Sequence, residues 1–568
     1  MSLGIDLQSK YFYIVDIRYK QKTLDLSKYI VDKKSEIMAL TPYSNYLLDN
    51  SGFEYSTFHT LVMTVEKFHK LTLEKYQEIE FFFSKCREYS FLFRDIAFIL
   101  TYEIYIELLF KFLENKRNEN YKIVYITDSS STQDNDMNLT SNDKSCIWQC
   151  KSIEKFIYIN NKNLFFYKVK NLEYNFLTLV YRKNILKKIF DRYVNPIKNK
   201  VLLSYDNVIF QNIYSSLKPV VVDIEIPYQK INIFLSELEK YLIREEQLSF
   251  ISNLYIELLV KFKNTISSQI IPSSIKIHPF VFLSNNQNYF EILLYENNKI
   301  PKIFMQHGSY LQENIFLKYG EIYPADINFV FNDFTKKLFE KKGAKKAYSV
   351  GSINFNYQIL EKEKKYDFLY IIYCTSYSYS GMQIFSDVNL LSVDAKNIFE
   401  RHAKTIELFG KKFKDKKLCI KIQAGIFRHS MLYVPFLELS REYINIDIEF
   451  VVPISKLIEK SKYIISDYFS SEFTNRELHY KRDIILFQGA PILLPEETIE
   501  DMDKMFILVE TVDDLKDKVE NIEKITKSRK RYDDIIERYS SKKCNTRKIT
   551  IEILEKEFEL SVKKRKIN

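Results

Sequence analysis

Short apolar runs separated by longer stretches of mixed polarity dominate this chain. In the first third, the runs at 11–17, 36–41 and 122–127 are rich in Ile, Val, Tyr and Phe, as buried strands are. Residues 64–118, between the second and third runs, predict a long helical insertion. Its most apolar part, 91–113, contains Arg94 and Asp95, so we expect an amphipathic or buried helix and no membrane span.

The second half alternates strands and helices more regularly. YDFLYIIYC (366–374) is an almost continuous apolar run, which is typical of a strand buried on both faces. A helix is predicted at about 392–413, and further strands are predicted at 417–423, 444–451, 462–467 and 483–487. Strands that alternate with helices in this way indicate a parallel sheet covered on both sides.

This pattern predicts three parts. An N-terminal α/β domain spans 1–350, with the helical insertion at about 64–118 and an exposed polar loop at 128–145. Within it, 218–226, 274–283 and 302–306 are expected strands. A second Rossmann-like domain spans 355–520, and a helical basic tail spans 521–568.

Most of the net positive charge of the chain lies near its C-terminus. The formal net charge is +10, and +7 of it lies in residues 523–568, which end in VKKRKIN. Such a tail predicts contact with anionic lipid, and a solvated helix with a basic end is the alternative. The 42 Tyr and 44 Phe fit a general compositional skew, so no nucleic-acid partner is expected.

The expected location is the cytoplasm, with peripheral attachment to the inner membrane. The six cysteines are sparse and mostly unpaired in sequence, which fits a reducing compartment. The N-terminus MSLGIDLQSKY lacks the apolar core of a secretory signal.

Glycine marks the first candidate for chemistry. The chain has only 10 glycines, and 8 of them lie between 308 and 489. In KIFMQHGSY (302–310), Gly308 follows a predicted strand and permits a sharp turn that would present His307 at the strand's carboxyl end. A neutral imidazole there can accept a proton near neutral pH, and the alternative is a buried structural histidine. Gly343 and Gly410 are instead expected to be helix C-caps.

A second candidate is KYIISDYFSSEF (462–473). Asp467 ends the predicted strand, and Ser470 and Ser471 begin the following helix. The free N–H groups at the start of such a helix can bind phosphate oxygens. The alternative is ordinary helix capping by Ser470 or Asp467.

QHG, VGS at 350–352 and the SDY–SS segment together resemble bacterial surface-polysaccharide transferases of the GT-B architecture. The similarity is to CDP-glycerol glycerophosphotransferases of teichoic-acid synthesis and to QHG-containing capsule and lipopolysaccharide sugar transferases. It covers roughly 270–500. It implies two Rossmann-like, doubly wound domains facing a cleft, with the nucleotide-activated donor held by the C-terminal one.

The resemblance also assigns roles. His307 would be the base or would line the donor phosphates. The following residues would bind the donor or its phosphates: Gln306, Gly308, Ser309, Gly351, Ser352, Asp467, Ser470 and Ser471. Thr375 and Ser376, which follow the strand at 366–374, and Lys421, in place of a family KxHP segment, are added as candidates, with Arg428 and His429 as uncertain substitutes for that segment.

Other candidates are weaker. DND (134–136) and DMD (501–503) match a DxD metal motif, but chance occurrence explains each, and GT-B enzymes generally need no such metal. His278 fits a core histidine, and Glu54 and His59 are candidates to face an acceptor.

The function predicted from the sequence is therefore a metal-independent glycosyltransferase with no cofactor. It would move a sugar from a nucleotide donor to a glycan or lipid-linked acceptor in surface-polysaccharide synthesis. DYFSS carries one more residue than the family's DYSS, and Gln306 replaces its Trp, which favours a sugar over glycerol phosphate. A glycerophosphotransferase, a nucleotide-sugar epimerase and a non-enzymatic membrane or nucleic-acid adaptor are the alternatives.

Overall fold

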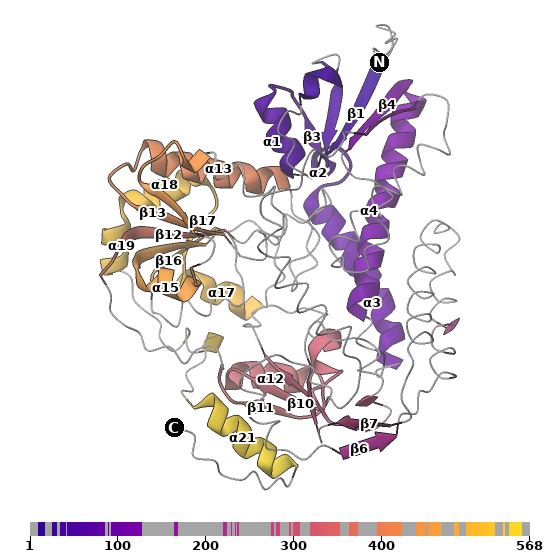
Figure 1. Ribbon diagram of the computed structural model, residues 1–568, viewed down its shortest axis with the longest axis vertical. Coiled ribbons are helices and arrows are strands. Elements are labelled where there is room, and N and C mark those ends of the chain that lie inside the picture. The colour runs from indigo at the N-terminus through magenta and orange to yellow at the C-terminus, as the bar shows by residue number, and fades with distance from the viewer. Residues whose placement is uncertain are drawn as a thin grey trace. The chain divides into compact units, whose positions relative to one another are not determined.

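The structure is a computed structural model, in which the chain forms two compact units (Figure 1). The first unit comprises residues 1–75, 100–178 and 358–536, and the second comprises 76–99, 179–357 and 537–568. The residues that the structure describes are 10–17, 25–30, 34–40, 42–85, 89, 93–127, 164–168, 220–223, 229, 233, 236–237, 274–277, 280–283, 295–296, 299–306, 318–352, 363–372, 395–422, 439–449, 452–466, 482–487, 496–528, 535, 538–539 and 545–558.

The first unit contains a five-stranded parallel sheet near the N-terminus. Its strands are β1 (Lys10–Asp16), β2 (Glu36–Ala39), β3 (Ser56–Thr57), β4 (Tyr121–Thr127) and β5 (Leu164–Lys168), in the order β3-β2-β1-β4-β5. One face packs Tyr13 and Val15 against Leu48 of α1 (Pro42–Asn50), while Phe12 on the other face meets Phe112 of α4. The predicted runs at 11–17, 36–41 and 122–127 are therefore strands.

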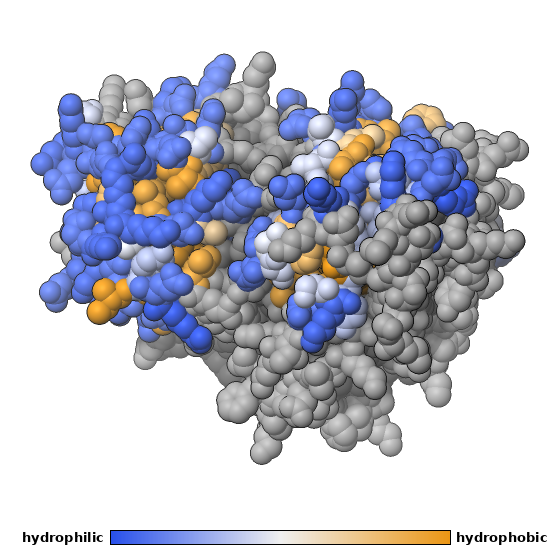
Figure 2. All heavy atoms as spheres, turned by 90° about the horizontal axis from the view of Figure 1, so that it is seen from above, coloured by the Kyte–Doolittle hydropathy of each residue, from blue (hydrophilic) through white to orange (hydrophobic). Residues whose placement is uncertain are grey.

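Helices are present where the long insertion is predicted. They are α2 (Phe58–Leu61), α3 (Val65–Lys85) and α4 (Phe93–Asn118), and a short 3-10 turn, η1 (Leu26–Lys28), precedes β2. Among the described residues, no helix is both long enough and apolar enough to cross a membrane. On the face shown in Figure 2, hydrophilic residues cover most of the coloured surface, and hydrophobic residues show only in small groups between them.

The first unit also contains a six-stranded sheet, and all its strands are parallel. They are β12 (Tyr366–Ile372), β13 (Leu418–Ile422), β14 (Ile446–Glu449), β15 (Ser461–Ser466), β16 (Ile484–Phe487) and β17 (Ile507–Val509). The order is β14-β13-β12-β15-β16-β17, so the chain runs outward from β12 to one edge and then returns to extend the sheet beyond β12.

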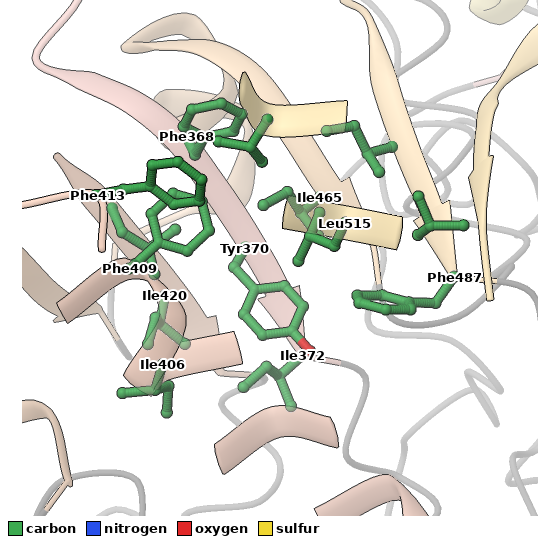
Figure 3. Packing of buried hydrophobic residues seen from close by; sticks show 14 of the residues in the cluster. Phe368, Tyr370, Ile372, Ile406, Phe409, Phe413, Ile420, Ile465, Phe487 and Leu515 are labelled. Carbon is green, nitrogen blue, oxygen red and sulfur yellow. The ribbon is translucent and has the colours of Figure 1, made fainter. Parts of the chain in front are cut away.

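Both faces of this sheet are covered. Phe368, Tyr370 and Ile372 pack on one face with residues of α13 (Ala395–Lys411), α18 (Val512–Glu520) and α19 (Ile522–Ser528) (Figure 3). The alternate residues of β12, Leu369 and Ile371, are buried as well. Two further helices, α15 (Ile454–Glu459) and α17 (Glu496–Met505), complete this part. The predicted α/β class with doubly wound parallel sheets is thus confirmed.

The second unit is built on a four-stranded parallel sheet of order β11-β10-β9-β8. Its strands are β8 (Val281–Leu283), β9 (Lys302–Met305), β10 (Ile327–Val330) and β11 (Ala347–Ser349). A π-helical turn, η4 (Lys318–Ile322), precedes β10, and α12 (Asp333–Lys341) connects β10 to β11. Two shorter strands, β6 (Val220–Asp223) and β7 (Ser274–Ile277), pair antiparallel.

The predicted strand at 274–283 is therefore wrong as a single element. It contains β7 and β8, which belong to different sheets, and β7 runs antiparallel to its partner. The prediction treated the apolar run as continuous, although Pro279 interrupts it and lacks the N–H that a ladder needs.

The two predicted glycine caps differ in outcome. Gly343 ends α12 with φ of +95°, as a C-cap should, so this prediction is confirmed. Gly410 lies inside α13, and a Cβ there would stand 2.2 Å from Cγ of Tyr443. The C-cap prediction is wrong for Gly410, because this glycine is needed for the close approach of an aromatic ring.

Much of the predicted basic tail is part of the folded units. Ile522 belongs to the core of the six-stranded sheet. In the second unit, α21 (Thr546–Glu557) buries Leu554 against the four-stranded sheet, and Phe558 stacks on Phe280 with ring centroids 4.9 Å apart. The last residues, 559–568, lie outside the described part of the chain.

Candidate functional site

The strand order of the six-stranded sheet contains the kind of switch point at which open parallel sheets bind ligands. β12 is followed in sequence by a helix and β13 on one side of it, whereas β15 pairs on its other side. Connections therefore leave β12 and β15 in opposite directions, and a crevice opens at their carboxyl ends in open sheets of this kind. The register pairs Ile371 with Ser466, so the two strands end side by side.

The sequence places two predicted phosphate-binding segments directly after these two strands. Thr375 and Ser376 come shortly after Ile372, the end of β12, and Asp467, Ser470 and Ser471 follow Ser466, the end of β15. All five residues lie outside the described part of the chain, as do Arg428 and His429. The structure shows that the two strands that precede these segments, β12 and β15, lie side by side.

Lys421 is described, and it is buried near the carboxyl end of β13. It is 7% exposed and pairs in register with Ile371 of β12 and Glu449 of β14. Its neighbours Ile420 and Ile422 point into the core shared with α13, so Lys421 points to the opposite face. Burial lowers the pKa of the Lys421 amine, opposed by Cys419 and Glu449. An anionic ligand beside the amine would raise its pKa again.

A second carboxyl edge, in the second unit, brings Gln306 and Gly351 together around the end of β10. Gln306 follows β9, and its backbone N–H donates to the Phe329 carbonyl at 2.9 Å. Its side-chain Oε1 accepts from the N–H of Phe331 at 2.7 Å, and the residue is 3% exposed. Gln306 therefore extends the pairing of β9 with β10 beyond the last strand residue.

Gly351 and Ser352 flank the same edge from the other side. The Gly351 N–H donates to the Val330 carbonyl at 3.3 Å, and its φ of +93° is a left-handed conformation that favours glycine. Ser352 is 1% exposed, and its carbonyl accepts from Thr546 Oγ1 at 3.2 Å. The buried position of Ser352 gives it a structural contact with α21. His307, Gly308 and Ser309 follow Gln306 in sequence but lie outside the described residues.

The acceptor-side candidates are not brought together. Glu54 is exposed, whereas His59 is 6% exposed among Phe58 and Phe68, with its Nδ1 2.9 Å from the Met63 carbonyl oxygen. These contacts give His59 a structural role in the core.

The DxD candidates gain no support as metal sites. DMD (501–503) lies within α17, where Asp501 is buried and pairs with Lys504 at 3.2 Å. No group of metal-binding side chains occurs within the described ranges. DND (134–136) and His278 lie outside them.

Asp16 is a buried polar residue that the sequence reasoning did not single out. It ends β1 at the switch point of the five-stranded sheet, is fully buried, and accepts from Tyr125 Oη at 2.7 Å. The available signal was an aspartate at the end of the otherwise apolar run YFYIVD.

Comparison with known proteins gives structural similarities only. No family model matches the chain, and no curated protein matches it. Among solved structures, the chain is similar to a glycosyltransferase from Rickettsia africae, at 13% identity and a TM-score of 0.31, covering 78% of this chain and 92% of the other. It is also similar to the UDP-GlcNAc 2-epimerase of Methanocaldococcus jannaschii in complex with UDP-GlcNAc and UDP, at 15% identity and a TM-score of 0.34. That match covers 70% of this chain and 94% of the epimerase.

Proposed function

We propose that this chain is a glycosyltransferase that moves a sugar from a nucleotide-activated donor to a hydroxyl of a glycan or lipid-linked acceptor. The observation that carries the proposal is the switch point between β12 and β15. Both predicted phosphate-binding segments follow these strands in sequence, and Lys421 supplies a buried amine on the adjoining strand. Open parallel sheets bind their ligands at this position.

The proposed reaction is a displacement at the anomeric carbon. The acceptor oxygen forms the new bond to that carbon, the bond from the carbon to the donor phosphate oxygen breaks, and the nucleotide leaves with the bonding electrons. His307 would take the acceptor proton. Lys421, Ser470 and Ser471 would stabilise the negative charge that grows on the leaving phosphate, so the proposal invokes no metal.

The contacts of Gln306 and Gly351 support the proposed placement of His307. Gln306 is tied to β10 through both its backbone and its side chain, and the turn at Gly351 lies on the other side of β10. We therefore assign Gln306 to positioning His307, with donor contact by Gln306, Gly308 and Ser309 kept as a prediction.

The proposal extends to surface polysaccharide synthesis, of capsule or lipopolysaccharide type, at the inner leaflet. Because α21 is packed on the second unit, the proposed lipid tether is confined to residues 559–568, which include four consecutive basic residues from Lys563 to Lys566. Each would contribute about 1 kcal/mol near an anionic surface. Deleting 559–568 should release the chain from anionic vesicles, and unchanged sedimentation with vesicles would remove this part of the proposal.

A thermal-shift screen against UDP, GDP, CDP and CMP and their sugars tests the function, because a ligand of the folded state raises the melting temperature. Failure of every nucleotide to raise it would overturn the proposal. Ser470→Ala with Ser471→Ala should weaken nucleotide binding by about 1.5–3 kcal/mol for each lost bond to a charged phosphate. Formation of a new nucleotide sugar without an acceptor would identify an epimerase instead.

A further inference from the structure

Asn328, the second residue of β10, buries a side-chain amide that the rest of the protein does not pair. The residue is fully buried, and within the described part of the chain neither its Nδ2 nor its Oδ1 has a hydrogen-bond partner. The amide of Asn445, in contrast, donates to three carbonyl groups. Burying an amide without a partner is unfavourable, and buried polar groups are nearly always paired. Both ends of the Asn328 amide are therefore expected to bind a group outside the protein chain.

The neighbours of Asn328 show which face of the sheet it occupies. Ile327 and Phe329, on either side of it in β10, pack with Leu554 of α21. Because successive side chains of a strand point to opposite faces, Asn328 points away from α21. Helix α12 contacts β10 and β11 from that side (Figure 1), and its Phe339 is fully buried without belonging to the core beneath α21. The amide therefore lies between β10 and α12.

The two faces of the four-stranded sheet differ in polarity. The buried strand residues that pack towards α21 are apolar, namely Phe282, Ile303, Ile327 and Phe329. The opposite face carries buried polar side chains as well. On that face Lys302 pairs with Asp326 at 2.9 Å, and Gln306 accepts a hydrogen bond from the N–H of Phe331 at 2.7 Å. Asn328 therefore lies on the face where polar groups are already accommodated, and a polar site of this kind can hold water, which an apolar cavity does not.

We infer that Asn328 binds a buried water molecule between β10 and α12. One water that accepts a hydrogen bond from Nδ2 and donates one to Oδ1 would satisfy both ends of the amide. Water is the smallest partner that can both donate and accept. The residues paired with Asn328 in register, Phe304 and Ala347, are 3% and 6% exposed, so the two neighbouring strands close the site to larger molecules. The site lies in the second unit and does not depend on the proposed transferase activity.

Magnetic relaxation dispersion of water oxygen, measured on the full chain, counts the water molecules that stay bound far longer than surface water does. Asn328→Leu cannot form hydrogen bonds and extends into the space beside the amide, so this variant should hold about one long-lived water fewer than the wild type. Asn521→Leu, which replaces an exposed asparagine after α18, is the matched control and should hold the same number as the wild type. A crystal structure of the wild type should show the water about 2.7–3.2 Å from both Nδ2 and Oδ1.

Asn328→Val provides a second variant, whose smaller side chain makes the same test without overpacking the core, and it should lose the water as well. An unchanged number of long-lived waters in the folded variants would overturn the inference. So would a wild-type crystal structure in which the Asn328 amide bonds only to protein groups, or in which no density lies beside it. That crystal structure decides the question even if neither variant folds.

Discussion

Gly410 offers the sharpest test of how the core of the six-stranded sheet is packed. A Cβ at this position would lie 2.2 Å from Cγ and 2.4 Å from Cδ1 and Cδ2 of Tyr443. Carbon atoms pack favourably at about 3.5–4.0 Å, so the ring of Tyr443 would have to retreat by more than about 1 Å. Gly410→Ala is therefore expected to destabilise the first unit.

The ring of Tyr443 has little room to retreat, because Asn445, two residues further along the chain, is bonded to the end of α13 and the turn that follows it. Asn445 Nδ2 donates to the carbonyls of Phe409, Phe413 and Lys416, at 3.1, 3.1 and 2.9 Å. Moving Tyr443 away from α13 would strain these bonds. Overpacking of this kind costs about 1–3 kcal/mol, and the better helix propensity of alanine offsets roughly 1 kcal/mol of that.

The decisive measurement is a double-mutant cycle with Tyr443→Ala. With the ring removed, Gly410→Ala should become neutral or stabilise by up to about 1 kcal/mol, because only helix propensity remains. Melting temperatures and hydrogen exchange of the α13 amides would report the change, which avoids assuming two-state unfolding for a chain of two units. A destabilisation by Gly410→Ala that is the same with and without Tyr443 would refute the packing argument.

Three further predictions concern the second unit and the proposed chemistry. Glu557→Gln should destabilise the docking of α21 by about 1–3 kcal/mol, because Glu557 accepts hydrogen bonds from Tyr348 and Lys346. Glu552→Gln, on the exposed face of α21, should leave the docking unchanged, and the rate of proteolytic cleavage after α21 would measure the difference. Burial alone would raise the pKa of Asp326, but hydrogen bonds from Lys345 and Lys302 outweigh it and lower the pKa below 3.8. The stability that Asp326 contributes is therefore complete above its unfolded pKa and is lost as the pH falls through the lower folded pKa. The melting temperatures of Asp326→Asn and wild type should begin to converge as the pH falls below about 3.8 and should meet only below the lower folded pKa. His307→Ala should keep the fold and lower transfer at least roughly 100-fold, and an unchanged rate would remove His307 from the chemistry.

Long apolar runs were sufficient to predict the central strands. YDFLYIIYC predicts β12 because a strand buried on both faces needs no polar alternation, and the observed strand covers seven of its residues. The short strands β10 and β11 were not predicted, because INFV and AYS are too short to show a period. The formation of β10 depends on its pairing with β9, and that of β11 on its pairing with β10, and local sequence encodes neither pairing.

The candidate site was likewise only partly predictable from the sequence. Lys421 was found because a lysine inside an apolar run is conspicuous, and the structure buries it at a strand end. The position of Arg401 was not predicted, because in sequence it is one more charged residue on an amphipathic helix. Only the packing of α13 against a strand far along the chain places its guanidinium over Phe487.

Topology alone would not have chosen between the two sheets of the first unit. Both place their first strand next to their fourth in the same way, β1 beside β4 and β12 beside β15, so both have a switch point. At the first of these, Asp16 is fully buried and accepts a hydrogen bond from Tyr125, which ties β1 to β4 and occupies the strand end with an acidic side chain. At the second, Lys421 is buried near the end of β13, and the Arg401 guanidinium of α13 lies over Phe487 at the end of β16. Under the proposed function, the side chains at the strand ends, rather than the strand order, therefore favour the six-stranded sheet for the phosphate-bearing donor.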